Sequence, residues 1–351
     1  MWVETDFEFT TLSVKNRDQL KSTADKIDAS VKRLLASDDN FHRRTENCAF
    51  ITVATPGYDF GLKTLCSSIR RHSNIPIIVL ASRQWNFETK LPSIYLLAVP
   101  GLFNERYRPD RSEFANTLTK LWTFGILCLD RIVFLDADCL VLKSIDDLFD
   151  DGSLRCAADC VEDSETRRLN SGLIAFGPSS QLRDLVFESA YDTASYDHGD
   201  QGLLDNILRS HVKYLPSEYN LTRHYALLHG PEASLDAARV IHYIVKKPWE
   251  LWYREIPDVA LIELDDLWTA QLSHDELLQL VSYWRRHQFT IERRRYESVA
   301  QSAGRILHSL AALFRSSRPF RYLIVFVAFI GALLAALLVA QTIWIMAHLH
   351  G

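Results

Sequence analysis

Residues 132–142, IVFLDADCLVL, constrain the possible folds most strongly, because two carboxylates interrupt an apolar run. Isolated charges resist burial unless they are paired or bound to a metal, so Asp136 and Asp138 are expected where a buried strand stops. If the whole run is one strand, both aspartates share a face and Ala137 points the other way. Both carboxylates could then reach one divalent cation. The alternative is a strand followed by an ordinary acidic turn.

Apolar segments elsewhere in the chain alternate between strand and helix patterns. Residues 49–54 (AFITVA) and 75–81 (IPIIVLA) are typical of buried strands, and residues 61–72 between them are typical of a helix. This order predicts a parallel sheet and an α/β fold. Further expected elements are helices over 14–35 and 117–128, a short acidic helix over 144–149 and a strand over 173–176.

A ligand site is expected beyond the carboxyl ends of these strands, where open α/β sheets bind nucleotides. Residues 55–58 follow one strand and Asp136 follows another, so both loops could line one crevice. No Gly-x-Gly-x-x-Gly or Walker pattern is present, which weakens dinucleotide and phosphate-loop alternatives. A divalent metal that bridges carboxylates and phosphate oxygens is another way to hold a diphosphate.

The composition is that of a globular protein with a sizeable core: 351 residues, 48% hydrophobic and 24% charged. The net charge of −5 is uneven. Residues 285–321 carry about +7, which leaves about −12 on residues 1–284 and argues against nucleic acid as a partner of the main domain. The six cysteines lack zinc-finger spacing and are expected to be reduced, mostly buried thiols.

The C-terminal part predicts a membrane anchor. Residues 322–347 contain no Asp, Glu, Lys or Arg over 26 positions, and about 20 apolar residues suffice to cross a bilayer core. Arg315, Arg318 and Arg321 precede this segment and no Lys or Arg follows it, which places the preceding domain in the cytosol. The first forty residues contain no apolar signal region, so no secretory signal is expected. The sequence therefore predicts a single-pass, tail-anchored protein with its globular domain facing the cytosol.

The segment before the predicted span has two interpretations. Ser273 and Glu276 resemble a capping box at the start of an amphipathic stretch, and an Arg-rich run follows it. This region is either a solvated helical stalk or a basic face that lies on anionic lipid. Gly331 and Ala335, four residues apart in the span, would permit a homodimer through helix pairing, although such spacing is common in Ala-rich spans.

Several polar clusters have ordinary explanations when each is taken alone. Asn170-Ser171-Gly172 is typical of a turn, and Asp200 could cap the helix that begins there. A lone His242 after apolar residues is more often a satisfied core histidine than a ligand. Asn220-Leu221-Thr222 matches a glycosylation sequon, which we discount on a domain expected in the cytosol.

The order of these motifs along the chain resembles that of family 8 glycosyltransferases, in particular the glycogenin and galactinol synthase group. The motifs are TLTKL (117–121), FLDADCLVL (134–142), IDDLFD (145–150), NSG (170–172), GDQG (199–202), YNL (219–221) and HY…KPW (242–249). The resemblance covers residues 48–252. It implies a GT-A type fold with a Rossmann-like mixed sheet flanked by helices, a retaining manganese-dependent reaction and a UDP-hexose donor.

The resemblance also implies roles for individual residues. The DxD residues Asp136 and Asp138, together with His242, correspond to ligands of Mn²⁺ or Mg²⁺, and the donor diphosphate completes the coordination. Lys247 corresponds to the cation that steadies the leaving phosphate, and Asp200 and Gln201 lie close to the anomeric carbon. Residues that correspond to donor-binding positions are Val53, Thr55, Tyr58, Arg111, Lys120, Asp159, Asn170 and Ser171.

The predicted organisation therefore has four parts. These are a polar helical segment (1–45), a GT-A glycosyltransferase domain (46–270), an amphipathic Arg-rich helical stalk (271–318) and a transmembrane anchor (319–351). The predicted function is transfer of a hexose from a UDP-sugar to a membrane-associated acceptor, which could be lipid-linked, a glycan or a polyol. The alternatives are a glycogenin-like self-glucosylating primer, a galactinol synthase-like polyol transferase and a non-catalytic tail-anchored scaffold.

Overall fold

The computed structural model describes the greater part of the first 284 residues. The described residues are 2–3, 7, 10–37, 46–54, 57–82, 91–107, 112–159, 167–222, 225, 235–244, 247–250 and 259–284. Residues 1–281 form one compact unit and residues 282–351 a second, of which only 282–284 are described. The predicted anchor at 322–347 and most of the predicted stalk therefore lie outside the described residues.

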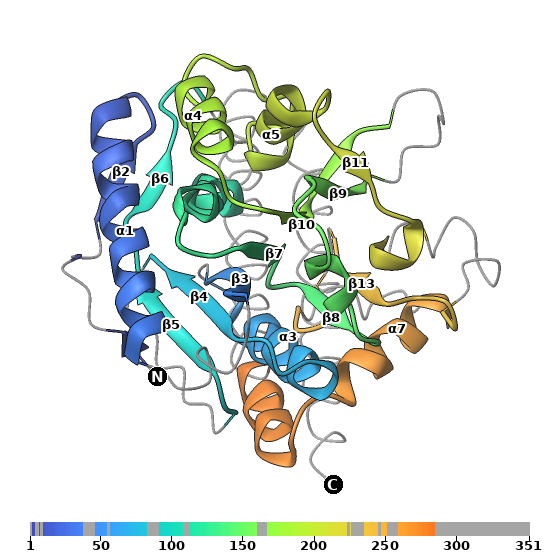
Figure 1. Cartoon of the computed structure of the whole chain (residues 1–351). Coiled ribbons are helices and arrows are strands. Elements are labelled where there is room, and N and C mark those ends of the chain that lie inside the picture. Colours follow the sequence, from blue (N-terminus) through green and yellow to red (C-terminus); the bar gives the residue numbers. More distant parts are fainter. Residues whose placement is uncertain are drawn as a thin grey trace, which may run out of the picture. The chain divides into compact units, whose positions relative to one another are not determined.

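An eight-stranded mixed sheet organises the first unit, and β10 is the strand that runs against the others (Figure 1). In spatial order the strands are β1 (Trp2–Val3), β5 (Ile94–Ala98), β4 (Ile77–Ala81), β3 (Cys48–Ala54), β7 (Arg131–Leu135), β10 (Leu169–Phe176), β9 (Arg155–Ala158) and β11 (Lys213–Tyr214). The parallel pairing predicted for residues 49–54 and 75–81 is confirmed by β3 and β4. The α/β class is confirmed as well.

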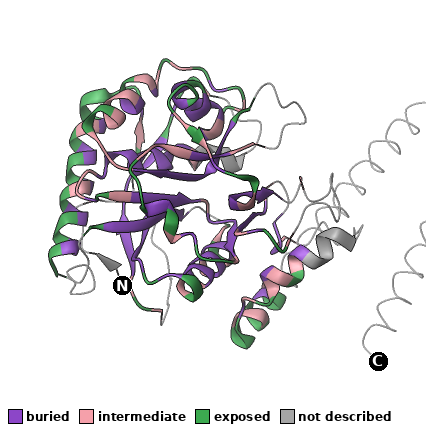
Figure 2. Ribbon diagram, turned by 45° about the vertical axis from the view of Figure 1, so that its right-hand side comes forward, coloured by how far each residue is buried: buried purple, intermediate pink, exposed green. Residues whose placement is uncertain are grey.

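Both faces of this sheet are covered, as the fully buried β3 requires. Ile51 and Val53 of β3 pack into one hydrophobic cluster, and the alternate residue Phe50 packs into another. The first cluster lies beneath α1 (Arg17–Ser37), the 3₁₀ helix η1 (Ser112–Gly125), α4 (Ser180–Ser189) and α5 (Asp200–Leu208). The second lies beneath α3 (Asp59–His72), on the opposite side of the sheet (Figures 1 and 2).

The N-terminal helix α1 packs onto this core with the face that its apolar periodicity predicts. Leu20, Ala24 and Ile27 are at most 1% exposed. On its polar face Asp28 accepts hydrogen bonds from the backbone nitrogens of Leu127 and Cys128, at 2.6 and 2.7 Å. Helix α1 therefore holds the chain that follows η1. The helix expected over 117–128 is present, but it is a 3₁₀ helix that ends at Gly125.

Of the two alternatives for residues 132–142, a single strand or a strand followed by a turn, the structure has the strand and turn. Strand β7 ends at Leu135, the last residue that pairs with β10, and Asp136 then donates its backbone N–H to Gly172. The next strand, β8 (Cys139–Val141), belongs to a separate three-stranded sheet with β12 (Leu221–Thr222) and β13 (Val240–His242). A turn separates the two strands, because neither carboxylate could stay buried in the sheet without a partner. Asp136 and Asp138 therefore do not share the face of a strand.

The other elements are β2 (Thr11–Ser13) paired with β6 (Gly101–Phe103), η2 (Asp146–Phe149), η3 (Ser217–Tyr219) and α7 (Val259–Thr269). Residues 274–284 are also helical. The capping box is confirmed, since Ser273 and Glu276 each accept a hydrogen bond from the other's backbone N–H. The described cysteines are free, and four of these five are buried. Within the described residues, no helix combines the length and apolarity needed to span a bilayer.

Candidate active site

A cavity of about 340 Å³ opens beyond the carboxyl ends of β3 and β7, at the edge where the sequence predicts a ligand site. Every candidate residue that the structure describes lines this cavity: Val53, Tyr58, Lys120, Asp136, Asp138, Asp159, Asn170, Ser171, Asp200, Gln201, His242 and Lys247. The candidates Thr55 and Arg111 lie outside the described residues. Four further lining residues were not singled out from the sequence: Thr117, Ala137, Asp197 and Ile244.

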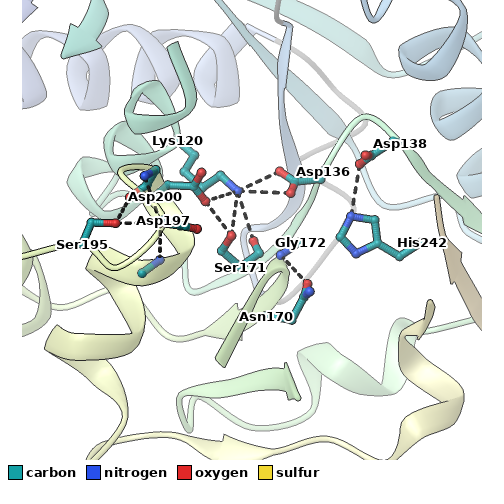
Figure 3. Close-up of polar contacts among 12 residues, drawn as sticks. Lys120, Asp136, Asp138, Asn170, Ser171, Gly172, Ser195, Asp197, Asp200 and His242 are labelled. Carbon is teal, nitrogen blue, oxygen red and sulfur yellow. Dashed lines mark hydrogen bonds and ion pairs between the residues drawn. The ribbon is translucent and has the colours of Figure 1, made fainter. Parts of the chain in front are cut away.

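One side of the cavity is an ionic network that we call the Lys120 network: Lys120, Asp136, Ser171 and Asp200 (Figure 3). The Lys120 ammonium, on η1, lies 2.9 Å from Asp136 Oδ1 and 2.6 Å from Asp200 Oδ2. Ser171 Oγ donates to the same Asp200 oxygen at 2.5 Å and accepts from Lys120 at 3.2 Å. A single buried cation therefore joins the turn after β7 to the first residue of α5.

The other side is a second network, the His242 network: Asp138, Asn220, His242 and Lys247. Asp138 Oδ1 lies 3.2 Å from His242 Nε2, and the Lys247 ammonium binds the other oxygen of Asp138. Lys247 also donates to the carbonyl of Tyr243 at 2.9 Å. The second ring nitrogen of His242, Nδ1, lies 3.1 Å from Asn220 Oδ1.

Two glycines permit close packing around the cavity. A Cβ at Gly172 would overlap the His242 ring, so only glycine fits beside that ring. A Cβ at Gly61, in the first turn of α3, would come within 2.5 Å of both the Ala137 carbonyl oxygen and the Trp249 ring. The Asp-Ala-Asp turn and Trp249 of the Lys-Pro-Trp motif therefore both pack directly on α3.

The composition of the Asn-Ser-Gly motif suggests a turn, but the motif is part of β10. The register between β10 and β9 shifts between Asn170 and Ile174, so the pairing is irregular there. Asn170 Oδ1 accepts the backbone N–H of Gly172 at 2.9 Å within this irregular stretch. Asn170 and Ser171, at this irregular stretch, line the cavity while the rest of the strand stays in the sheet.

Asp197 caps the N-terminus of α5, the role expected of Asp200. Its Oδ1 accepts the backbone N–H groups of Gly199 and Gly202 at 2.9 and 3.1 Å. The N-cap residue Gly199 supplies no side chain, so α5 depends on Asp197 in the preceding loop. The carboxylate of Asp200 is thereby left to the Lys120 network. The signal that could have identified Asp197 is its place in the Tyr-Asp-His-Gly-Asp segment before the helix.

Burial and charge shift the ionisation of both networks. Burial alone would lower the pKa of Lys120, but the carboxylates of Asp136 and Asp200 outweigh it and raise that pKa above its usual value. For Asp138, burial favours a higher pKa, but Lys247 and His242 prevail and lower it. For Asp136, burial is the largest influence and its pKa is raised. Both lysines remain charged, because Asp138 likewise raises the pKa of Lys247 against the effect of burial.

The His242 network fits a divalent cation. A carboxylate oxygen and an imidazole nitrogen face each other there, and both are common ligands of Mn²⁺. The Cys139 sulfur lies within 4.8 Å of both ligand atoms. Burial raises the pKa of that thiol well above its usual value, so it is not available as a thiolate. Asp136 is not part of this group, and its carboxylate binds Lys120.

Comparison with known proteins identifies the family. The sequence model of the family described as Glycosyl transferase family 8 matches residues 103–253. This range includes most of the cavity residues. Glycogenin-1 from Mus musculus is 31% identical over 250 residues, which cover 66% of this chain and 73% of that protein. The chain belongs to glycosyltransferase family 8. The resemblance of its motifs to this family is confirmed.

Another curated relative and one solved structure are also similar to this family 8 glycosyltransferase. Inositol phosphorylceramide glucuronosyltransferase 1 from Arabidopsis thaliana is 35% identical over 117 residues, which cover 33% of this chain and 20% of that protein. The solved structure of the glycosyltransferase GlyE from Streptococcus pneumoniae is 17% identical, with a TM-score of 0.48 over 70% of this chain and 64% of that one.

Family membership settles the class of reaction. Family 8 enzymes use UDP-sugar donors and typically a divalent metal, so the chain is a UDP-sugar glycosyltransferase. Its mixed sheet, covered by helices on both faces, agrees with a GT-A type fold. The expectation of an enzyme is confirmed.

Proposed function

We propose that this enzyme is a retaining, divalent-metal-dependent hexosyltransferase that acts on a membrane-associated acceptor. The observation that carries the proposal is the convergence of the described candidate residues on one cavity with two differently charged sides. One side presents a carboxylate and an imidazole beside Lys247, which suits a cation and a diphosphate. The other presents hydroxyl, amide and carboxylate groups that suit a sugar.

The donor diphosphate would lie on the side of the His242 network. Asp138 and His242 would hold the Mn²⁺ or Mg²⁺ ion, and Asp136, across the same cavity, is the third candidate ligand. When bound, the ion neutralises negative charge that develops on the diphosphate as the glycosidic bond breaks. Lys247, 5.5 Å from the Tyr58 ring centre, would add a second positive charge for the leaving phosphate. Tyr58 and Val53, with Thr55, would form the uridine pocket.

The transferred sugar would lie on the side of the Lys120 network. Gln201 Nε2 donates to Asp159 at 3.1 Å, which orients its amide oxygen away from that carboxylate. Gln201 and Asp200 would lie next to the anomeric carbon, with Asn170 and Ser171 on the sugar hydroxyls. Arg111 remains a candidate contact to the donor.

Retention of configuration requires the acceptor to arrive on the face that the leaving group departs from. Asp200 Oδ2 is already bound by Lys120 and by Ser171 Oγ, which reduces its strength as a nucleophile. The arrangement therefore favours front-side attack, with Asp200 orienting the sugar. Trapping a glycosyl-enzyme on Asp200, detected by mass spectrometry, would contradict this.

A membrane-associated acceptor follows from the apolar segment 322–347, since an anchor is most useful if the acceptor is at the membrane too. The name of one relative, inositol phosphorylceramide glucuronosyltransferase 1, refers to a lipid acceptor. Cytosolic orientation of the cavity is part of the same proposal. Attachment to the membrane is tested by fusing a fluorescent protein to the C-terminus and fractionating the cells. Recovery of the intact chain in the soluble fraction would contradict the proposed anchor.

The decisive test is a panel of UDP-sugars with Mn²⁺, read for donor hydrolysis without acceptor. We expect turnover of a UDP-hexose that EDTA abolishes and that Asp138→Asn lowers by about 10²- to 10³-fold. The control Asp192→Asn changes an exposed carboxylate paired with Arg17 and should retain turnover. Turnover that persists in EDTA, or that stays at the wild-type rate in Asp138→Asn, would contradict the proposal.

Self-glucosylation is the second candidate function, and the 31% identity to glycogenin-1 over 250 residues favours it. Intact-protein mass after incubation with UDP-glucose and Mn²⁺ separates the two functions, because only a self-priming enzyme gains hexose units. A polyol transferase would instead release a soluble glycosylated polyol in the same assay when the polyol is supplied.

A further inference from the structure

The His242 ring is held in a defined orientation by its surroundings. Its side chain is 5% exposed, and it lies against Gly172, where a Cβ would overlap Cε1 and both ring nitrogens. Its backbone is fixed on both sides, because β13 pairs with β12 through Thr222 and with β8 through Cys139. The ring therefore has one place to lie, and what matters chemically is which nitrogen carries the proton.

The two ring nitrogens face different groups. Nε2 faces Asp138 Oδ1 inside the cavity, while Nδ1 faces Asn220 Oδ1 at 3.1 Å. Asn220 is 4% exposed and directly precedes β12, so the pairing of β12 with β13 places it beside His242. An amide oxygen only accepts hydrogen bonds, so this contact requires a proton on Nδ1. A neutral ring with its proton on Nδ1 has its lone pair on Nε2.

We infer that Asn220 is a positioning residue that selects the ring nitrogen with which His242 binds the cation. Its Oδ1 holds the proton on Nδ1, which leaves Nε2 free to act as a ligand together with Asp138 Oδ1. Asn220 does not line the cavity and therefore acts through His242. The inference rests on the proposed assignment of Asp138 and His242 as cation ligands.

A competing arrangement makes a different demand on residue 220. The described residues offer Asn220 Nδ2 no hydrogen-bond partner. If the amide were reversed, Nδ2 would donate to Nδ1, the proton would sit on Nε2, and Nε2–H would bond Asp138 without any cation. The inferred arrangement needs an acceptor at position 220 and the competing one needs a donor. Aspartate supplies only acceptors and leucine supplies neither, so Asn220→Asp and Asn220→Leu distinguish the two.

The first experiment measures Mn²⁺ binding to the full chain, without nucleotide, by isothermal titration calorimetry. We expect Asn220→Leu to weaken binding by about 10- to 100-fold, the usual effect of removing a hydrogen-bond partner of a metal-bound histidine. Asn220→Asp should bind at least as tightly as wild type. The control is Asn104→Leu, because Asn104 is also 4% exposed but bonds the Ala190 carbonyl away from the cavity. It should bind like wild type, with folding of each variant checked by circular dichroism.

Two results would overturn the inference: wild-type affinity in Asn220→Leu, or an equal loss in Asn220→Asp and Asn220→Leu. Because a new carboxylate attracts cations by charge alone, a second measurement reads the proton itself. Nitrogen-15 NMR of histidine-labelled protein saturated with Mg²⁺, which is diamagnetic, reports which ring nitrogen carries the proton when a cation faces Nε2. The His242 signal is identified by its loss in His242→Gln.

We expect the proton on Nδ1 in wild type and in Asn220→Asp, and a shift toward Nε2 in Asn220→Leu. A wild-type proton on Nε2 would overturn the inference whatever the binding data show. A wild type with the Nδ1 tautomer that does not bind Mn²⁺ would instead refute the proposed metal site and leave the hydrogen-bonding role of Asn220 intact.

Discussion

The two carboxylates of the Asp-Ala-Asp turn are separated by one residue, yet they belong to networks of different character. In the Lys120 network every charge has a protein partner, because one ammonium serves both Asp136 and Asp200. In the His242 network a carboxylate oxygen and a ring nitrogen face each other at 3.2 Å, and two acceptors at that distance need a proton or a cation between them. The first network is complete within the protein, whereas the second is suited to take up an ion.

The end of one strand creates this difference. Because β7 stops at Leu135 and β8 joins another sheet, the turn directs Asp136 toward η1 and Asp138 toward β13. The cavity thereby acquires a side of hydroxyl and amide groups and a side that suits a metal and a diphosphate. A substitution on one side should therefore change different properties from a substitution on the other.

The largest expected effect is that of Asp138→Asn on activity. The amide removes the negative charge that faces His242 and Lys247, and we expect kcat/KM for the UDP-hexose to fall by about 10²- to 10³-fold, as when a preorganised electrostatic group is lost. Mn²⁺ affinity should fall with it, while Asp136→Asn should affect Mn²⁺ affinity less. Titrating Mn²⁺ at fixed donor checks both, and an equal loss of affinity in the two variants would mean that the networks are not distinct.

The second effect is on stability and concerns the Lys120 network. Lys120→Met leaves Asp136 and the buried Asp200 without their shared cation, and breaking a buried pair in this way costs about 3–5 kcal/mol. Denaturant unfolding of the metal-free protein measures the change. The control Lys21→Met removes an exposed partner of Glu188 and should leave the unfolding midpoint nearly unchanged. Similar midpoints for the two variants would show that Lys120 does not stabilise the cavity.

The sequence predicts the parallel strands and the cavity residues well, for identifiable reasons. Apolar runs such as that of β3 are long enough to mark buried strands, and the position of polar groups at their carboxyl ends marks a ligand site. Amphipathic periodicity likewise predicts α1. The order of motifs along the chain adds residues such as Asp159 and Gln201, which no local pattern would single out.

The two aspartates mark the break in residues 132–142, but the sequence could not show that the second apolar half joins another sheet. That placement depends on pairing of β8 with β13, about one hundred residues away, which local periodicity does not contain. The same holds for Asn220, which a sequon pattern obscured and which gains meaning only from its contact with His242. Asn-Ser-Gly has turn composition, and only the pairing of β10 with β9 shows that the motif lies in a strand, at a shift of register.

A smaller effect should follow from Gly172→Ala. This substitution changes the backbone beside the His242 network and leaves the residues of both networks in place. The added methyl group overlaps the His242 ring and must displace it, so we expect Mn²⁺ affinity to fall by about 10-fold or more. The matched control is Gly152→Ala, whose Cβ would meet its nearest neighbour, Arg131, at an ordinary 3.5 Å. Calorimetry on both variants checks this, and unchanged affinity in Gly172→Ala would mean that His242 is not held as described.

The smallest effect concerns how the stability of the fold depends on pH. It tests directly whether the pKa values of the two aspartates are shifted in opposite directions. Lys247 and His242 overcome burial and lower the pKa of Asp138, so its contribution is present above the unfolded value of about 3.9 and is lost as pH falls through the folded pKa. Burial raises the pKa of Asp136, so folded protein binds that proton more tightly and gains stability as pH falls. In metal-free protein, Asp138→Asn should therefore reduce the loss of stability between pH 7 and pH 3, whereas Asp136→Asn should increase it. Urea unfolding midpoints across this range measure both slopes, and slopes that change in the same direction would show that the two carboxylates share one environment after all.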